Sequence, residues 1–106
     1  MIDLEHLSRQ TMDDKALQSE VLRLFHQQLL GAKDVIQVMA VSDRRDLAHL
    51  LEGAAKAVGA FSFAETLKAL THDPANRGSV ERAAEQIDSL LAHLCSKLGR
   101  EDVLKG

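Results

Sequence analysis

The sequence has no tryptophan or tyrosine, only three phenylalanines, one proline and one cysteine among its 106 residues. Aromatic and β-branched residues favour strands, so a core built mainly from leucine, valine and alanine favours packed helices over a sheet. The single cysteine, Cys95, has no partner for a disulfide, which is typical of a reducing compartment. Cys95 lies close to the apolar positions of the last predicted helix. We therefore expect its side chain to be buried as a small hydrophobic group and not to be a reactive thiol.

The chain also lacks a cluster of charge of one sign and a long hydrophobic run. Its formal net charge is −3, and its basic and acidic residues are interspersed, so no basic stripe is present to hold a nucleic-acid backbone. No stretch approaches the roughly 18 apolar residues of a membrane span, and the first five residues are acidic where a secretory signal needs positive charge. We therefore expect a cytoplasmic protein that binds neither nucleic acid nor membrane, with a single domain over residues 1–106.

Apolar residues recur along most of the chain at the three- and four-residue intervals of amphipathic helices. The pattern and its capping residues predict five helices. The first is a short helix over 4–9 capped by Asp3, and the second runs from the capping box at 11–14 to about Val41. The others run from Ser42 or Asp43 to about Gly59, from Ser62 to about Thr71, and from Ser79 to Gly99. We predict a loop at residues 73–78 and a frayed tail at residues 100–106. The expected fold is all-α, an antiparallel up-and-down four-helix bundle with a short extra N-terminal helix.

The predicted helix over 45–60 has two distinct faces. Its apolar stripe, which must face a core, consists of Leu47, Leu51, Ala54 and Val58. The opposite face carries four polar residues and a glycine: Arg45, His49, Glu52, Gly53 and Lys56. We therefore expect the imidazole of His49 to face water. Gly53 lies one turn after His49, where a glycine costs about 0.5–1 kcal/mol relative to alanine, so its missing side chain suggests that another molecule approaches the ring closely.

The residues His49-Leu50-Leu51-Glu52-Gly53, followed by Gly59-Ala60, resemble the His-x-x-Lys-Gly…Gly-Ala signature of histidine phosphotransfer (HPt) domains. HPt domains are four-helix bundles with an exposed histidine midway along one helix, so the resemblance implies the same fold. Glu52 departs from the signature, because it stands where the family usually has a lysine that faces the phosphoryl group.

The resemblance implies a phosphorelay intermediate. In this interpretation Nε2 of His49 accepts a phosphoryl group from the aspartate of a response-regulator receiver domain and passes it to another receiver aspartate. A hybrid histidine kinase and receiver domains are the implied partners, and the Mg²⁺ of the reaction is expected on the receiver, so this chain needs no cofactor of its own. The sequence contains no ATP site, and we expect a monomeric phosphocarrier rather than an autonomous kinase.

Charges near His49 bear on this chemistry. Arg45 lies one turn before His49 and Lys56 two turns after it, so both can offset phosphoryl charge, and Lys56 can lean back over Gly53 towards the ring. Glu52 would repel the incoming group by about 1 kcal/mol per charge pair, which predicts transfer that is several-fold to tenfold slower but not abolished.

The sequence bears on two other kinds of function, metal binding and docking without phosphotransfer. No two histidines lie three or four residues apart on one helix. Asp46 and His49 have the carboxylate–histidine spacing of di-iron helical bundles, but such a site also needs inward-facing glutamates on partner helices. We therefore expect no metal site. His6, His26, His72 and His93 are best interpreted as surface or boundary residues. Two alternatives stay open: a helical-bundle module that docks receiver domains or other signalling proteins without carrying phosphate, and an unrelated helical adaptor in which the motif is accidental.

Overall fold

The computed structural model describes residues 2–98, and within that range every regular element is a helix. The five helices are α1 (Leu4–Gln10), α2 (Lys15–Lys33), α3 (Val41–Val58), α4 (Phe61–His72) and α5 (Arg77–Leu98). The prediction of an all-helical fold is therefore confirmed. The predicted frayed tail at 100–106 lies outside the described residues.

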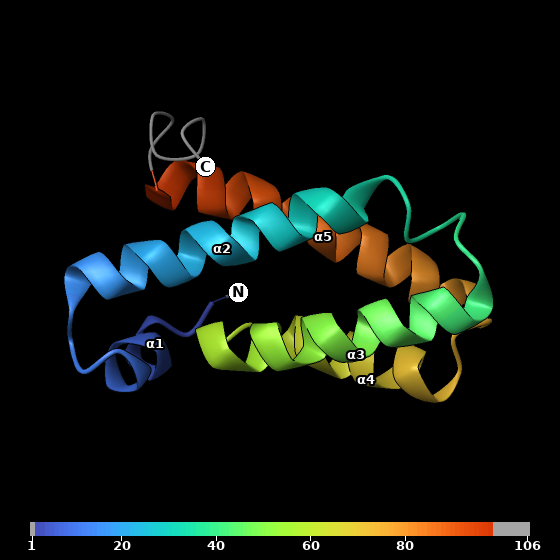
Figure 1. The fold of residues 1–106 in the computed structure, drawn as a ribbon, viewed down its shortest axis with the longest axis horizontal. Helices are drawn as coiled ribbons and strands as arrows, with labels where there is room; N and C mark the ends of the chain where they lie inside the picture. The colour runs from blue at the N-terminus through green and yellow to red at the C-terminus, as the bar shows by residue number, and fades with distance from the viewer. Residues whose placement is uncertain (1, 99–106) are drawn as a thin grey trace.

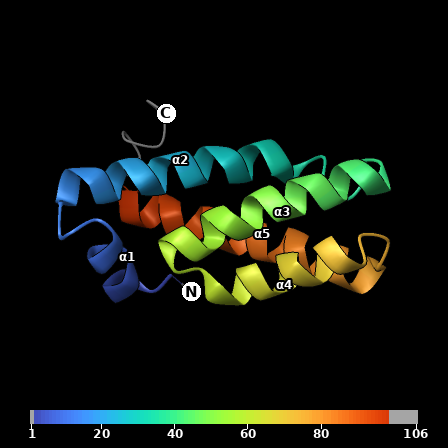
Figure 2. The same cartoon turned by 60° about the horizontal axis from the view of Figure 1, so that its bottom comes forward.

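The helices pack side by side as an elongated bundle. From α2 to α5 each helix runs back along the one before it, and α1 lies across one end near the close of α3 (Figures 1 and 2). The largest contact is between α3 and α4, and α2 packs mainly against α5. Among residues 2–98, no helix is long and apolar enough to cross a membrane.

The core is aliphatic, as the composition predicted. Leucine, alanine, valine and isoleucine side chains from all five helices and from the α2–α3 connection fill it, and Phe25 meets Phe63 edge-on with ring centroids 6.4 Å apart. On α3 the buried positions are Arg44, Ala48, Leu51, Ala55 and Val58, whereas Leu47 and Ala54 are only partly buried. The observed apolar face is therefore rotated slightly from the predicted one, because Ala48 and Ala55 take the buried positions in place of Leu47 and Ala54.

Several predicted helix starts were wrong by a few residues. Asp3 caps α1 as expected, accepting a hydrogen bond from the backbone N–H of His6 at 3.0 Å. Thr11, however, closes α1, and Asp14 caps α2 through the N–H of Leu17. Asn76 caps α5 by accepting from the N–H of Ser79 at 3.1 Å, so the loop predicted for 73–78 is shorter than expected.

The starts of α3 and α4 lack the side-chain caps that the sequence suggested. Ala40 and Ala60 occupy the N-cap positions, and neither helix has a side-chain hydrogen bond at its cap, contrary to the expectation for Ser42, Asp43 and Ser62. Alanine is a poor cap, so these helix starts depend on tertiary contacts.

The helix α2 ends at Lys33 instead of near Val41, and the buried guanidinium of Arg44 binds the connection that follows it. Its nitrogens donate hydrogen bonds to the backbone carbonyls of Ile36 (2.7 Å), Gln37 (3.0 Å), Met39 (3.3 Å) and Pro74 (2.9 Å). Arg44 therefore joins the α2–α3 connection to the α4–α5 connection. Residues 34–38 form turns, and the guanidinium holds this connection in place through the carbonyls of Ile36, Gln37 and Met39.

Gly59 ends α3, as predicted. Its φ of +81° is left-handed, and the N–H groups of Gly59 and Ala60 donate to the carbonyls of Lys56 and Ala55, which is the hydrogen-bond pattern of a Schellman motif. A Cβ at Gly59 would come within 2.8 Å of the Asp3 carbonyl oxygen. The Asp3 N–H in turn donates to the Gly59 carbonyl at 2.9 Å. Glycine is thus required both by the turn and by the close approach of the N-terminal segment.

Two side chains differ from their predicted environment. Cys95 is exposed rather than buried, because it lies on the outer face of α5 between the buried Leu94 and Leu98. His26 is buried with 5% of its surface exposed, although we expected a surface or boundary position. It stands beside Phe25 on the core-facing side of α2, where burial lowers the pKa of its imidazole.

We predict that His26 makes the protein less stable in mild acid. An unfolded histidine has a pKa of about 6.5, and burial lowers the folded value, so below about pH 6.5 the unfolded chain binds a proton that the folded chain does not. The full stability is therefore present above this pH and is lost as the pH falls towards the lowered folded pKa. Urea unfolding at about pH 7.5 and about pH 5.5 should show a smaller pH dependence for His26→Gln than for wild type. His72→Gln, at an exposed position, is the matched control, and an equal pH dependence in all three proteins would contradict the prediction.

Candidate functional site

His49 lies near the middle of α3 and is exposed, as its place on the polar face predicted. The residues that anchor this part of α3, Ala48 and Leu51, are both fully buried. Because these neighbours fix the rotation of the helix, the imidazole projects from the surface of the bundle. An imidazole in this position is accessible to a second molecule.

The helix surface next to His49 is open at Gly53. A Cβ built on Gly53 meets no atom within 4 Å, so nothing in the described structure requires a glycine there. No left-handed φ explains it either, since Gly59 is the one glycine with positive φ among residues 2–98. Neither packing nor backbone conformation requires Gly53, a property that it shares with Gly31 of α2. What distinguishes Gly53 is its place one turn after His49, where a missing side chain leaves room for another molecule.

Glu52 and Lys56 form an ion pair one turn apart on α3, with Oε2 and Nζ 2.9 Å apart. The glutamate side chain is only 13% exposed, whereas the lysine is 59% exposed. The hydrogen bond from Lys56 lowers the pKa of the Glu52 carboxyl, partial burial opposes the shift, and the charges of Lys56, His49 and Lys68 lower the pKa further. The sequence interpretation had Lys56 leaning back over Gly53 towards His49, whereas in the structure Lys56 pairs with Glu52.

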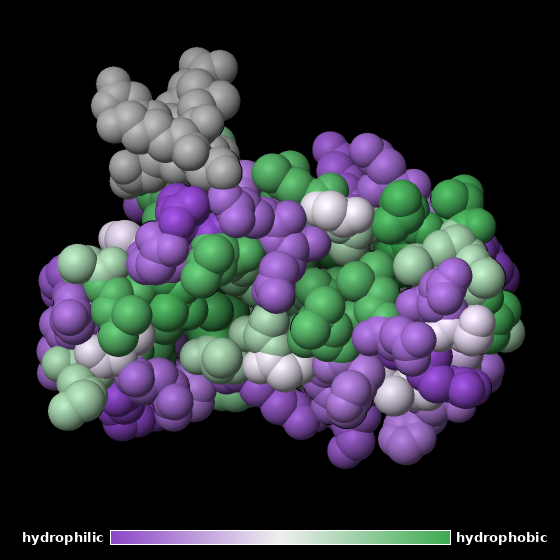
Figure 3. Space-filling view, in the orientation of Figure 1, coloured by the Kyte–Doolittle hydropathy of each residue, from purple (hydrophilic) through white to green (hydrophobic). Residues whose placement is uncertain are grey.

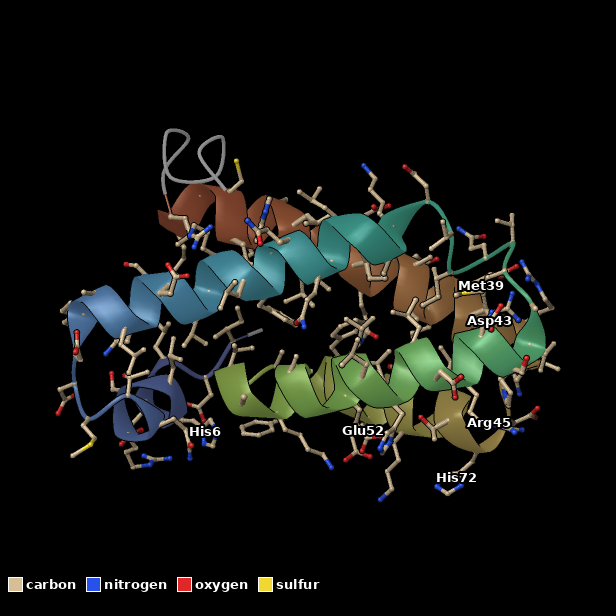
Figure 4. The ribbon with its side chains drawn as sticks, viewed as in Figure 1. His6, Met39, Asp43, Arg45, Glu52 and His72 are labelled. Carbon is tan, nitrogen blue, oxygen red and sulfur yellow. The ribbon has the colours of Figure 1, made fainter. Side chains whose placement is uncertain are left out.

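Arg45 is exposed, and in the part of the chain that the structure describes it takes part in no ion pair. Figure 4 shows Arg45 and Glu52 projecting from the same side of α3, the side on which His72 of α4 also lies. The structure thus gathers Arg45, His49, Glu52, Gly53 and Lys56 on one exposed face of α3, as the helical spacing predicted. Gly59 and Ala60, the other half of the motif, form the turn that ends this helix.

Lys68 of α4 belongs to the same site and was missed by the sequence analysis. It is an exposed residue whose charge acts on the Glu52 carboxylate together with that of His49. The tight turn at Gly59 and Ala60 sets the register of α4 against α3, and residues equally distant from this turn lie opposite one another. Glu52 and Lys68 are equally distant from Ala60, so counting outward from the predicted turn would have found the pair.

Two hollows in the described surface are lined by residues other than His49. One, of about 490 Å³, lies between α4 and α5 and is lined by polar and small residues that include Ser62, Asn76 and Arg82. A smaller apolar groove of about 150 Å³ lies between α2 and α3, with Leu24 and Ala57 on its walls. Figure 3 shows apolar side chains gathered along this seam, and Leu50, next to His49 in the chain, is 59% exposed.

Among residues 2–98, no group of three or more His, Cys, Asp or Glu side chains is arranged to hold a metal ion. Comparison with protein-family models, with curated proteins and with solved structures finds no match to this chain.

Proposed function

We propose that this protein is a histidine phosphotransfer domain, a phosphorelay intermediate that carries a phosphoryl group on His49 between receiver-domain aspartates. The observation that carries the proposal is the exposed imidazole of His49 beside the open surface at Gly53. The course of helices α2 to α5 supports the finer fold assignment, an antiparallel up-and-down four-helix bundle with α1 as the short extra helix. The motif residues Gly59 and Ala60 also support this fold assignment, since the turn that they form sets how α4 packs on α3.

The proposed reaction is nucleophilic displacement at phosphorus. The lone pair on Nε2 of the neutral His49 imidazole attacks the phosphorus of an aspartyl phosphate, the P–O bond to the aspartate breaks, and the carboxylate leaves with the electron pair. The reverse sequence on a second receiver returns the phosphoryl group to an aspartate. Imidazole is largely uncharged near neutral pH, so the attack needs no dedicated base.

The chain's own contribution is access and charge. The ring is presented on a rigid helix anchored by Ala48 and Leu51, and Gly53 leaves room for the receiver's active-site loops. Arg45 lies one turn before His49, forms no ion pair among residues 2–98, and is suited to offset phosphoryl charge, which is about −1.5 to −2 on other phosphoresidues. The Mg²⁺ of the reaction belongs on the receiver, and this chain is proposed to act as a cytoplasmic monomer without a cofactor.

A receiver domain that carries a radiolabelled aspartyl phosphate tests the proposal. Mixed with this protein, it should transfer the label, and the acquired label should be labile in acid and stable in alkali, as expected for phosphohistidine. Label that stays on the receiver, for every receiver and hybrid kinase tested, would contradict the proposal.

The second candidate function is a module that docks receiver domains without carrying phosphate. The observations that favour it are the carboxylate of Glu52 beside His49 and the apolar groove between α2 and α3, next to the exposed Leu50. Saturable binding of a receiver domain without transfer of label would favour this function over phosphotransfer.

We predict that Gly53→Ala stabilises the protein but slows transfer. The position is helical, exposed and open, so the added methyl group should raise the free energy of unfolding by about 0.5–1 kcal/mol. The same methyl group narrows the approach to His49, so the transfer rate should fall several-fold. Gly31→Ala in α2 is a matched control, because a Cβ there also meets no atom within 4 Å. Urea unfolding should show a similar stabilisation in both variants, and an unchanged transfer rate for Gly53→Ala would contradict the docking role of Gly53.

A further inference from the structure

The charges around Glu52 come from two helices whose register is fixed. Gly59 ends α3 in a left-handed conformation and α4 begins at Phe61, so the two helices leave one tight turn and run back along each other. They form the most extensive helix contact of the bundle. Positions equally distant from the turn are level with one another, which places Lys68 of α4 across from Glu52 of α3.

Glu52 is therefore a partly buried carboxylate between two lysines. Lys56 holds it from one turn further along α3 at 2.9 Å, and Lys68 acts on it from α4. Lys68 is itself exposed and forms no ion pair among residues 2–98, so its ammonium group is free to move. His49 lies one turn before Glu52, and its charge also acts on the Glu52 carboxylate.

We propose that Lys56 and Lys68 together form the cationic seat for a phosphoryl group on His49, and that Glu52 is an internal counter-ion which that group displaces. This inference rests on the proposed function. Two lysines and one glutamate leave a single net positive charge beside His49, the same charge as the lysine that Glu52 replaces in the motif.

The exchange of anions follows from charge and geometry. A phosphoryl group carries about −1.5 to −2 charge and three acceptor oxygens, against one charge and two oxygens for a carboxylate. It therefore competes well for both ammonium groups, and each long lysine side chain can reorient without moving a helix. Lys68 is a positioning residue for the phosphoryl group, and Glu52 lowers the affinity of the empty seat for other anions.

The test is the equilibrium constant for transfer from a phosphorylated receiver, supplemented by direct loading with phosphoramidate. In direct loading the P–N bond of the donor breaks, ammonia leaves, and the new P–N bond forms at His49. We expect Lys68→Met to lower the transfer equilibrium constant by about three- to tenfold, as the loss of one charge pair implies. Lys68→Arg should restore it, and Lys33→Met, at the exposed end of α2, should leave it unchanged. Glu52→Gln should raise it several-fold, and by less when combined with Lys68→Met.

A second readout does not need transfer. NMR titration of the Glu52 carboxyl in the unphosphorylated protein should show a higher pKa in Lys68→Met than in wild type, and no change in Lys33→Met. The outcomes separate the two proposals. If neither donor labels the wild-type protein, the phosphotransfer function fails. If the wild type is labelled normally and Lys68→Met matches it in both the equilibrium constant and the titration, the role of Lys68 fails alone.

Discussion

A His49→Gln protein is expected to take up no phosphoryl label from a phosphorylated receiver domain, whereas the wild-type chain becomes labelled. Glutamine keeps a polar side chain of similar size but offers no nucleophilic nitrogen, because its amide lone pair is delocalised. Two of the other histidines have different surroundings: His26 is buried, and His6 lies on α1 with its ring 5.0 Å from that of Phe61. The expected result is loss of the acid-labile label, measured by transfer assay and by phosphate release in acid.

The substitution should not disturb the fold. His49 is exposed, and surface substitutions of this kind usually change the free energy of unfolding by less than about 0.5 kcal/mol. The matched control is His72→Gln, at an exposed histidine of α4 on the same side of the molecule, which should be labelled like wild type. Full labelling of His49→Gln, or loss of label in His72→Gln, would place the chemistry elsewhere.

The helices themselves could be predicted because each obeys a local rule. Apolar spacing marked the four longer helices, Asp3 marked the start of α1, and Gly59 marked the end of α3. The errors arose where a distant residue decides the local structure. The connection after α2 is bound by the guanidinium of Arg44, which comes later in the sequence and also contacts Pro74. Nothing in the residues around Lys33 records that contact.

The candidate site was predictable in its positions but not in its pairings. Helical spacing alone put His49, Gly53 and Arg45 on one face of α3, because the face of a helix follows from its period. Whether Lys56 reaches His49 or Glu52 depends on rotamers, and the structure pairs it with Glu52 at 2.9 Å. Whether Lys68 lies close enough to act on Glu52 depends on the register of α4 against α3, which is a tertiary property set by the turn at Gly59.

Burial of single side chains was the least predictable property. His26 and Cys95 both lie near the edge of an apolar face, where a small rotation of the helix moves a residue in or out. The structure turns His26 of α2 inward and Cys95 of α5 outward. Periodicity locates the centre of an apolar face well, but the position of its edges depends on how closely the neighbouring helices approach.

Replacing Arg44 with methionine is expected to lower the free energy of unfolding by about 3–5 kcal/mol, the largest effect on stability that we expect from a single substitution in this protein. Arg44 is only 5% exposed, and its guanidinium donates to four backbone carbonyls in two connections that lie far apart in the sequence. Methionine fills similar volume but donates nothing, so carbonyls such as those of Ile36 and Pro74 lose their partner. Urea unfolding measures the change.

Two variants separate this network from a general effect of charge. Arg45→Met removes the same charge from the next, exposed position and should change stability by less than about 0.5 kcal/mol. Arg44→Lys should fall between wild type and Arg44→Met, because one ammonium group cannot reach both connections as a planar guanidinium does. Hydrogen exchange of the amides at 34–40 should accelerate in Arg44→Met, since these turns lose their anchor. Equal stability of Arg44→Met and Arg45→Met would mean that the carbonyls find other donors, and the α2–α3 connection would then owe its shape to the burial of Ile36.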